Sequence, residues 1–380
     1  MSLPQPQPER FREVYKLSKL SLGPQQVNGG GETLPQKQSQ QQQQLKGPPK
    51  TSAKSLETFL QELRATLPES RRPFVINLNG DGAMLIAIPR PLSEVQVVQK
   101  AFYYLITDPW LDGTADFLGQ PMFISLGHIE TEAYRSIAAV ELLIRAIENA
   151  VPGQSEPQSS SYGNDLPTRP GIDAIIVSNA LADHAHPPTL LTADPKTPLF
   201  AASDAVGTIK LWDHFEHMWT IPNLQIGGKS PLPKWLNVVR LPAESEALEV
   251  THGILITWTA NQASRPEGIL YAPHGVAVET VERVLVGSRI IRLLAILHPV
   301  NQTLTEGAAD SLGVHTGLLV YRATDAKYWV QTHDPDLERG GILAEFQEFQ
   351  ELSLEDALAV NPGPRPNFWP RVNGGIYPLV

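Results

Sequence analysis

The sequence contains no cysteine, and this absence limits the chemistry that the chain can perform. Without cysteine there are no disulfides, no thiolate metal ligands and no cysteine nucleophile. Any metal ion must therefore be held by His, Asp or Glu. A chain without disulfides is typical of a cytosolic protein.

Long apolar runs are also missing. No stretch approaches the ~20 consecutive apolar residues that span a bilayer. The opening residues, MSLPQPQPERFREVYK, lack the apolar core of a secretion signal. We therefore expect a cytoplasmic protein with no membrane partner.

Basic residues are scarce in most of the chain. Residues 73–380 carry nineteen Lys or Arg against thirty-four Asp or Glu, whereas residues 1–72 carry eleven against six. Affinity for phosphate backbones comes largely from Lys and Arg, so we expect no nucleic-acid partner.

Composition divides the chain into three parts. Residues 1–54 are rich in Pro, Gln and Gly and include the tract QKQSQQQQQ, so we predict a disordered leader. Residues 55–360 are long enough for one folded domain with a sizeable core. Residues 361–380 are again rich in Pro and Gly, and we expect them to form a tail over the surface.

The order of elements predicts an α/β layered fold. SLETFLQELRATL (55–67) has apolar residues at helical spacing, with Ser55 as a plausible N-cap. Two apolar strands around a Gly-Asp-Gly turn follow in 73–91. From residue 172 onward, strands alternate with helices, as in folds that cover sheets with helices.

The familiar short catalytic motifs do not occur. There is no G-x-S-x-G elbow, no Walker loop and no G-x-G-x-x-G that opens a helix. We interpret NLNGDGAML as a hairpin turn and not as a phosphate-binding loop.

Histidines instead follow four apolar runs. Ligands in open α/β sheets gather in loops at the C-terminal ends of strands, so these side chains are expected to converge at one sheet edge. The four loops carry Asp183, His184 and His186 after AIIVS, His274 after GILYAP, His298 after RLLAIL, and His333 after KYWVQT.

The first of these loops resembles the signature loop of metallo-β-lactamase-fold hydrolases, which reads H-x-H-x-D-H directly after a buried strand. The same six positions here read Asn179, Ala180, Leu181, Ala182, Asp183 and His184. The chain is also similar to an uncharacterised fungal branch of this fold, through ITDPWL, ADHAHPPTL, YAPHG and KYWVQTHD. This likeness covers roughly residues 73–345 and implies a four-layer αββα sandwich.

The resemblance implies one metal site where the superfamily has two. Leucine has no donor atom and asparagine is a poor zinc ligand, so the first site is expected to be absent at Asn179, Leu181 and a position near Asn261. The second site is expected to keep one divalent ion, most plausibly zinc. Its ligands would be Asp183, His184, His333 and, where the family has a bridging aspartate, His274.

Each of these residues also has an ordinary structural interpretation. His333 and His274 fit loop or turn positions, and Asp183 fits a helix start. Asp108 in DPWLDG either orients a ligating histidine or ends a strand at a Pro turn. His186 is either a partner of a ligand or a substitute ligand. His298 and His315 are candidates for contact with a substrate.

Two functions remain open at this point. The first is a single-metal hydrolase of an ester, lactone, amide or phosphodiester, with a small-molecule substrate and Asp183 as ligand or base. The second is a non-catalytic binding or scaffold protein of the same fold. The loss of the two motif histidines favours the second function, and the retained half-site favours the first.

Overall fold

In the computed structural model, the described residues are 53–117, 122, 124–152, 171–224, 231–241, 250–259, 265–286, 290–305, 308–334, 336–342, 344 and 347–380. All of them belong to one structural unit. The predicted leader, apart from residues 53 and 54, lies outside the described residues.

The first large sheet has seven strands and is half parallel. In spatial order they are β19 (Ile376–Pro378), β1 (Phe74–Asn77), β2 (Met84–Pro89), β3 (Phe102–Thr107), β6 (Ala174–Val177), β7 (Leu199–Ala201) and β8 (Met218–Thr220). The first four strands pair antiparallel. From β3 to β8 all pairs are parallel, so these strands end at one edge.

The second large sheet has six strands. Their spatial order is β18 (Phe368–Trp369), β15 (Tyr328–Gln331), β12 (Arg292–His298), β11 (Glu267–Tyr271), β10 (Gly253–Trp258) and β9 (Leu236–Leu241). From β18 to β11 the pairs are parallel. The remaining pairs are antiparallel.

The two sheets pack face to face because their strands carry apolar residues on both faces. In β1 and β2, Val75 and Met84 enter the apolar cluster between the sheets. Their neighbours Ile76 and Leu85 enter the cluster on the outer face of the first sheet. Alternation along a strand therefore buries each strand on both sides.

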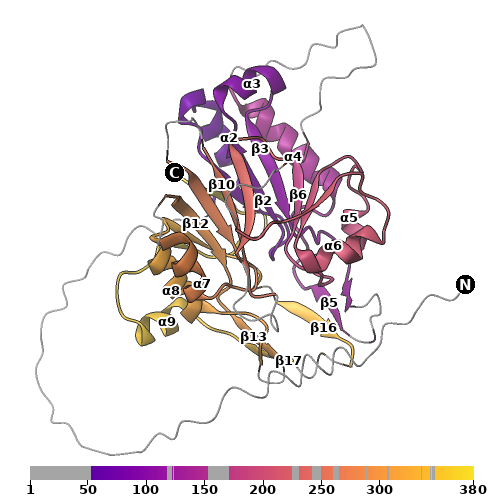
Figure 1. Ribbon diagram of the computed structural model, residues 1–380, viewed down its shortest axis with the longest axis vertical. Helices are drawn as coiled ribbons and strands as arrows, with labels where there is room; N and C mark the ends of the chain where they lie inside the picture. Colours follow the sequence, from indigo (N-terminus) through magenta and orange to yellow (C-terminus); the bar gives the residue numbers. More distant parts are fainter. Residues whose placement is uncertain are drawn as a thin grey trace, which may run out of the picture. The chain divides into compact units, whose positions relative to one another are not determined.

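Helices cover the two outer faces (Figure 1). The first sheet is covered by α2 (Leu56–Arg64), α4 (Ile137–Ala150), α5 (Pro187–Leu190) and α6 (Ser203–Lys210). The second is covered by α7 (Val278–Val281), the π-helical turn Glu282–Val286, α8 (Val314–Thr324) and α9 (Leu354–Val360). The four layers are thus helix, sheet, sheet and helix, the order that the resemblance implied.

The helix ends follow their sequence signals. Ser55 caps α2 by accepting from the Thr58 amide, and Ser136 caps α4 by accepting from the Ala139 amide. The apolar face of α4 includes Ile144, which is fully buried against the first sheet. Burial of one such side chain contributes about 1.5–3 kcal/mol.

The remaining elements are short. They are the helix α3 (Leu92–Val98), the 3₁₀ turn Pro68–Ser70, the sheet β4 (Ala115–Asp116), β5 (Ser125–His128) and β16 (Leu337–Gly340), and the sheet β13 (Gln302–Thr305), β14 (Ala308–Ala309) and β17 (Gln347–Gln350).

The structure corrects the prediction for residues 361–380. We expected a surface tail, but this segment supplies an edge strand to each large sheet, β18 beside β15 and β19 beside β1. Trp369 and Tyr377 enter the cluster between the sheets. Strands of two or three residues among Pro and Gly carry too little pattern to be recognised in the sequence.

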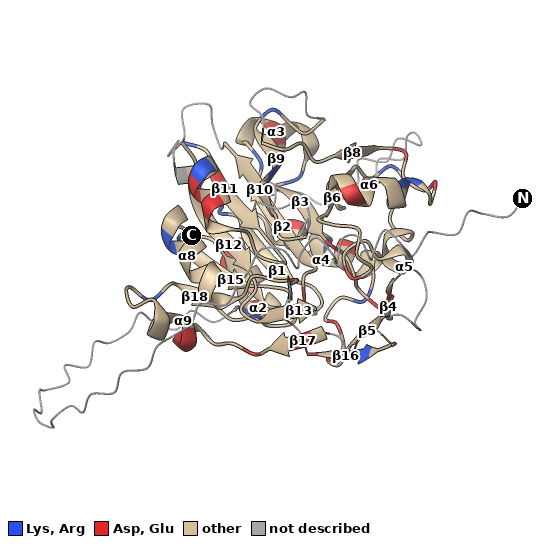
Figure 2. Cartoon of the chain, turned by 60° about the horizontal axis from the view of Figure 1, so that its bottom comes forward, with Lys and Arg blue, Asp and Glu red and all other residues tan. Residues whose placement is uncertain are grey.

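Charged residues are rare in the central strands and lie mainly on helices, loops and strand ends (Figure 2). Among the described helices, none combines the length and the apolar character that a membrane crossing requires.

Candidate metal centre

Four strand ends bring the candidate site together. Asp108 follows β3, Asp183 and His184 lie in the loop after β6, His274 follows β11, and His333 follows β15. β3 and β6 are parallel neighbours in the first sheet, while β11, β12 and β15 are parallel in the second. The loops after these strands meet at one end of the two packed sheets, beyond the C-terminal ends of the strands.

Three imidazoles form the centre of the site. The candidate ligand atoms of His184, His274 and His333 all lie within 4.8 Å of one another. Nε2 of His184 and Nε2 of His274 are 2.9 Å apart. The side chains of His184 and His333 are only 1% and 12% exposed. The cluster is therefore nearly enclosed by protein.

His184 is oriented by Asp108. Its Nδ1 lies 2.7 Å from Asp108 Oδ2, which also accepts from the hydroxyls of Ser178 and Tyr271. A carboxylate only accepts, so Nδ1 of His184 carries a proton and Nε2 points into the cluster. Burial alone would lower the pKa of His184, but the nearby charges of Asp183 and Asp108 raise it.

Asp108 itself is held by the fold. Burial would raise the pKa of this carboxyl, but His184 and the hydrogen bonds from Ser178 and Tyr271 lower it. The residue has φ 42°, in the left-handed region that Asp tolerates better than most side chains. Asp108 thus takes the orienting position that the sequence suggested.

His333 has a second carboxylate partner, Asp81, which the sequence interpretation missed. Nδ1 of His333 lies 2.8 Å from Asp81 Oδ1. Burial opposes the charge on His333, but Asp81 raises the pKa of the imidazole to about 9. We had interpreted Gly80-Asp81-Gly82 only as a hairpin turn between strands. The signal available was an acidic residue in a turn at the end of a buried strand.

Gly82 lies directly against this pair. A Cβ atom there would lie 3.4 Å from both His333 Nδ1 and the Tyr271 hydroxyl. His333 has φ 55°, so it is held in the left-handed region, as is Asp108. Such conformations cost about 1–3 kcal/mol and are often retained at functional sites.

His274 and Asp183 complete the cluster. Burial, followed by the charges of His333 and His184, lowers the pKa of His274 well below its usual value. Asp183 Oδ2 lies 3.5 Å from His184 Nε2 and 3.8 Å from His333 Nε2. Its other oxygen, Oδ1, is buried and has no hydrogen-bond partner among the described residues.

These donors fit a single divalent cation. Two nitrogens bound tetrahedrally to zinc at ~2.0–2.1 Å would be about 3.3 Å apart, close to the 2.9 Å between His184 and His274. An anionic oxygen buried without a partner is costly, and a cation would meet the need of Asp183 Oδ1. The Asp108–His184 and Asp81–His333 pairs are the carboxylate–histidine arrangement found behind metal ligands.

The positions that correspond to the superfamily's first metal site offer no comparable set of ligand atoms among the described residues. The side chain of Asn179 bonds locally, because its Oδ1 accepts from the Leu181 amide and its Nδ2 donates to the Ser178 hydroxyl. Leu181 contributes no donor. Asn261 lies outside the described residues.

The structure corrects three predicted contacts. Both ring nitrogens of His186 are engaged, one with the Thr189 hydroxyl and one with the Thr114 carbonyl, so it is neither a ligand nor a partner of one. His298 is fully buried, its Nδ1 bonds the Pro299 carbonyl, and burial lowers its pKa to about 4. It therefore packs behind the site and cannot touch a substrate.

His315 is also away from the cluster. It lies on α8, in the outer helix layer, near Asp356 of α9. The sequence placed His315 on the predicted edge or on the helix behind it; the structure places it on that helix, and it is not among the histidines that could hold an ion.

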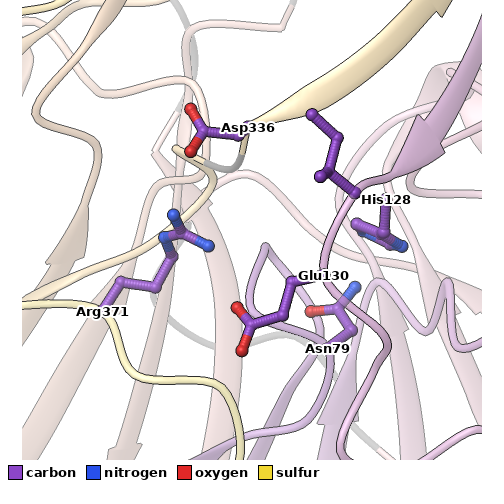
Figure 3. A pocket seen from close by; sticks show the side chains of 6 residues that line it. Asn79, His128, Glu130, Asp336 and Arg371 are labelled. Carbon is purple, nitrogen blue, oxygen red and sulfur yellow. The ribbon is translucent and has the colours of Figure 1, made fainter.

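A small cleft lies beside the cluster (Figure 3). Its space is about 70 Å³, and it is lined by Asn79, His128, Ile129, Glu130, Asp336 and Arg371. His128 stacks on Trp110 at 3.8 Å, and its Nε2 lies 3.6 Å from Asp81 Oδ2. The cleft therefore borders the far side of the carboxylate that orients His333.

The layer order and the place of the cluster decide the fold. Two face-to-face sheets carry helices outside, and the Asp183–His184 pair occupies the loop after β6, where the resemblance puts the metal motif. The fold is thus the four-layer αββα sandwich that the resemblance to metallo-β-lactamase-fold proteins implies. The likeness to a fungal branch remains a prediction.

No family model matches the chain, and no curated protein matches it. Among solved structures, it is similar to a possible metal-dependent hydrolase from Veillonella parvula DSM 2008, with 11% identity, TM-score 0.48, and 81% of this chain and 100% of that chain covered. An isothiocyanate hydrolase from Delia radicum gut bacteria has 10% identity, TM-score 0.45 and coverage of 80% and 98%. The metallo-β-lactamase fold protein YhfI from Bacillus subtilis has 10% identity, TM-score 0.42 and coverage of 80% and 99%. At TM-scores below 0.5 we draw no conclusion about activity from these likenesses.

Proposed function

We propose that the chain is a single-metal hydrolase of a small molecule, with zinc as the preferred ion. The observation that carries the proposal is the convergence of His184, His274 and His333, two of which have a carboxylate on the opposite ring nitrogen. That pairing fixes the tautomer of each ring with Nε2 free for a cation. Packing alone does not require it.

The residues divide the work as follows. A divalent cation held by His184, His274, His333 and Asp183 would supply Lewis acidity toward a carbonyl or phosphoryl oxygen and lower the pKa of water. Asp108 and Asp81 keep two of the imidazoles in the required tautomer. Where the three histidines alone hold the ion, Asp183 would instead be the base that takes up a proton during hydrolysis of an ester, lactone, amide or phosphodiester.

Enclosure of the cluster favours a second candidate, a non-catalytic metal-binding protein. Four protein ligands can saturate zinc, whereas a catalytic ion needs an open position. The side chains of His184 and Asp183 are 1% and 6% exposed. A substrate would need an approach beside His333, the most exposed of the three imidazoles.

Metal analysis tests the shared part of both candidates. The full chain, stripped with a chelator and reloaded, should retain about one equivalent of zinc after dialysis. His333→Ala should lose it, whereas the control His214→Ala should not, because His214 bonds the Ala193 carbonyl outside the cluster. No retained metal under any loading, or two equivalents, would overturn the proposal.

Turnover then separates the two candidates. Loaded protein is assayed against ester, lactone, amide and phosphodiester substrates beside Asp183→Asn, which keeps the size of the side chain. Hydrolysis that disappears in Asp183→Asn and after chelation supports the hydrolase. One bound equivalent without any such hydrolysis favours the non-catalytic protein.

A further inference from the structure

The connector between β18 and β19, residues 370–375, contacts two loops of the candidate metal centre and the loop after β5 beside it. We propose that this connector is part of the centre: Arg371 and Asn373 are positioning residues that hold Asp81 against His333. The inference rests on the proposed metal site and adds to it two residues from a segment far away in the sequence.

The first contact is with the turn that carries Asp81. The guanidinium of Arg371 donates from Nη1 to the Gly80 carbonyl, directly before Asp81. Gly80 has φ +74°, and a Cβ atom there would lie 3.3 Å from that nitrogen and 3.4 Å from Asn373 Cβ. Arg371 and Asn373 therefore pack onto the turn at its tightest point.

Backbone bonds fix the start of the same turn. The Asn77 amide donates to the Gly375 carbonyl, and the Gly374 amide donates to the Asn77 carbonyl, each at 3.0 Å. The Asn77 side chain in turn donates to the Asp81 carbonyl at 3.0 Å and accepts from the Gly80 amide. The connector thus holds the whole turn from Asn77 to Asp81.

The second contact is with the loop after β5. The Asn373 side chain donates to the Thr131 carbonyl at 2.8 Å and accepts from the Ala133 amide at 2.9 Å. Glu132, between these two residues, lies 2.9 Å from Nδ1 of His128. Nε2 of the same His128 faces the second oxygen of Asp81 at 3.6 Å.

The third contact is with the loop of His333. The Arg371 amide donates to the Gln331 side chain at 3.2 Å, two residues before the histidine. Gln331 also donates to Asp334, the residue directly after His333. One short connector therefore sets the position of both partners of the Asp81–His333 hydrogen bond.

These contacts converge on one pair, because they end on the turn of Asp81, on the strand end before His333, or beside Glu132, whose partner His128 faces Asp81. In Figure 3, Arg371 enters the cleft from one side, and Asn79, which precedes Gly80, lies on the other. Loss of its guanidinium should leave the sheets intact and loosen Asp81. The consequence should be measurable at His333.

A double-mutant cycle on metal affinity tests the proposal. Arg371→Met should weaken zinc affinity about tenfold, the lower end of losses seen when partners behind metal ligands are removed. Arg371→Lys keeps a donor and should recover most of the affinity. Arg365→Met is the matched control, since Arg365 pairs with exposed Glu355 elsewhere in the same segment.

The cycle partner is Asp81→Asn. If Arg371 acts through Asp81, the double variant binds zinc no more weakly than Asp81→Asn alone. Losses that multiply, or an unchanged affinity in Arg371→Met, overturn the inference. Asn373→Ala gives an independent second variant if Arg371→Met does not fold, and an unchanged affinity in it counts equally against the proposal.

A measurement without metal keeps this inference separate from the metal proposal. In chelator-treated protein with ¹⁵N-labelled histidine, the Nδ1 proton of His333 should exchange slowly with water, and its resonance is assigned by its loss in His333→Gln. Arg371→Met should accelerate this exchange at least tenfold, and Arg365→Met should not. Unchanged exchange refutes the inference, whereas absent zinc binding in wild-type protein refutes only the proposed function.

Discussion

Replacement of Asp108 by Asn is the most direct test of how the centre is built. Asp108 accepts four hydrogen bonds: from the Ser178 amide at 2.7 Å on Oδ1, and from the Ser178 hydroxyl, the Tyr271 hydroxyl and His184 Nδ1 at 2.5, 2.6 and 2.7 Å on Oδ2. Asn has nearly the same size and tolerates the left-handed backbone at φ 42°. The substitution therefore changes the hydrogen bonding and the charge, and leaves packing and backbone almost unchanged.

The expected magnitude follows from where the amide group can lie. If the NH₂ group takes the place of Oδ1, it opposes the Ser178 amide; if it takes the place of Oδ2, it opposes three donors. The milder case loses one hydrogen bond to a charged group, worth about 1.5–3 kcal/mol, and leaves a buried donor unsatisfied at about 1–3 kcal/mol. We expect a loss of about 3 kcal/mol in the free energy of unfolding. Zinc affinity should fall ~10–100-fold because His184 keeps only a neutral amide oxygen in place of the carboxylate.

Urea unfolding of chelator-treated protein measures the first effect, and zinc competition with a chromophoric chelator measures the second. Asp325→Asn is the matched control, because Asp325 also has a left-handed backbone, φ 52°, but is exposed at the end of α8. Its change in stability should stay within about 0.5 kcal/mol. If Asp108→Asn behaves like this control in both assays, the orienting role of Asp108 is wrong.

Three further predictions use other parts of the structure. His274→Ala should lower zinc affinity at least ~10-fold, and unchanged affinity by competition titration would make His274 a simple turn residue. Gly317→Ala should lower the free energy of unfolding in urea by about 1–3 kcal/mol, because its Cβ would lie 2.5 Å from Trp329. Gly207→Ala, whose Cβ would have no atom within 4 Å, should raise it by ~0.5–1 kcal/mol. Equal effects of the two substitutions would contradict this prediction. Burial raises the pKa of Glu148, so the folded chain binds this proton more tightly than the unfolded chain, and its contribution to stability falls as pH rises above 4.5. Wild type should therefore lose stability relative to Glu148→Gln as the pH rises above 4.5, and a difference independent of pH would count against it.

The sequence predicted an α/β layered fold because its cause is local. Strand and helix periodicity indicated which segments form buried strands and which form helices with one apolar face, as in 73–91 and in α2. The edge strands β18 and β19 were not predicted, because their stability comes from pairing with β15 and β1, far away in the chain. No pattern within a few residues reports such pairing.

The same division applies to the centre. Strand ends predicted that Asp183, His184, His274 and His333 would meet, because parallel strands share an edge. The direction of each ring was not predictable. His186 is two residues from His184, yet it turns to Thr114 and Thr189, and Asp81 enters from a turn that looked purely structural.

The late position of β18 and β19 has a consequence for synthesis. Translation proceeds from the N-terminus, so while residues 368–378 are still within the ribosome, β1 and β15 each present an open edge to solvent and to other chains. The loops of Asp81 and His333 also wait for Arg371 until that moment. A nascent chain can therefore assemble its helices and inner strands early, but the centre takes its final form only when this last stretch has emerged.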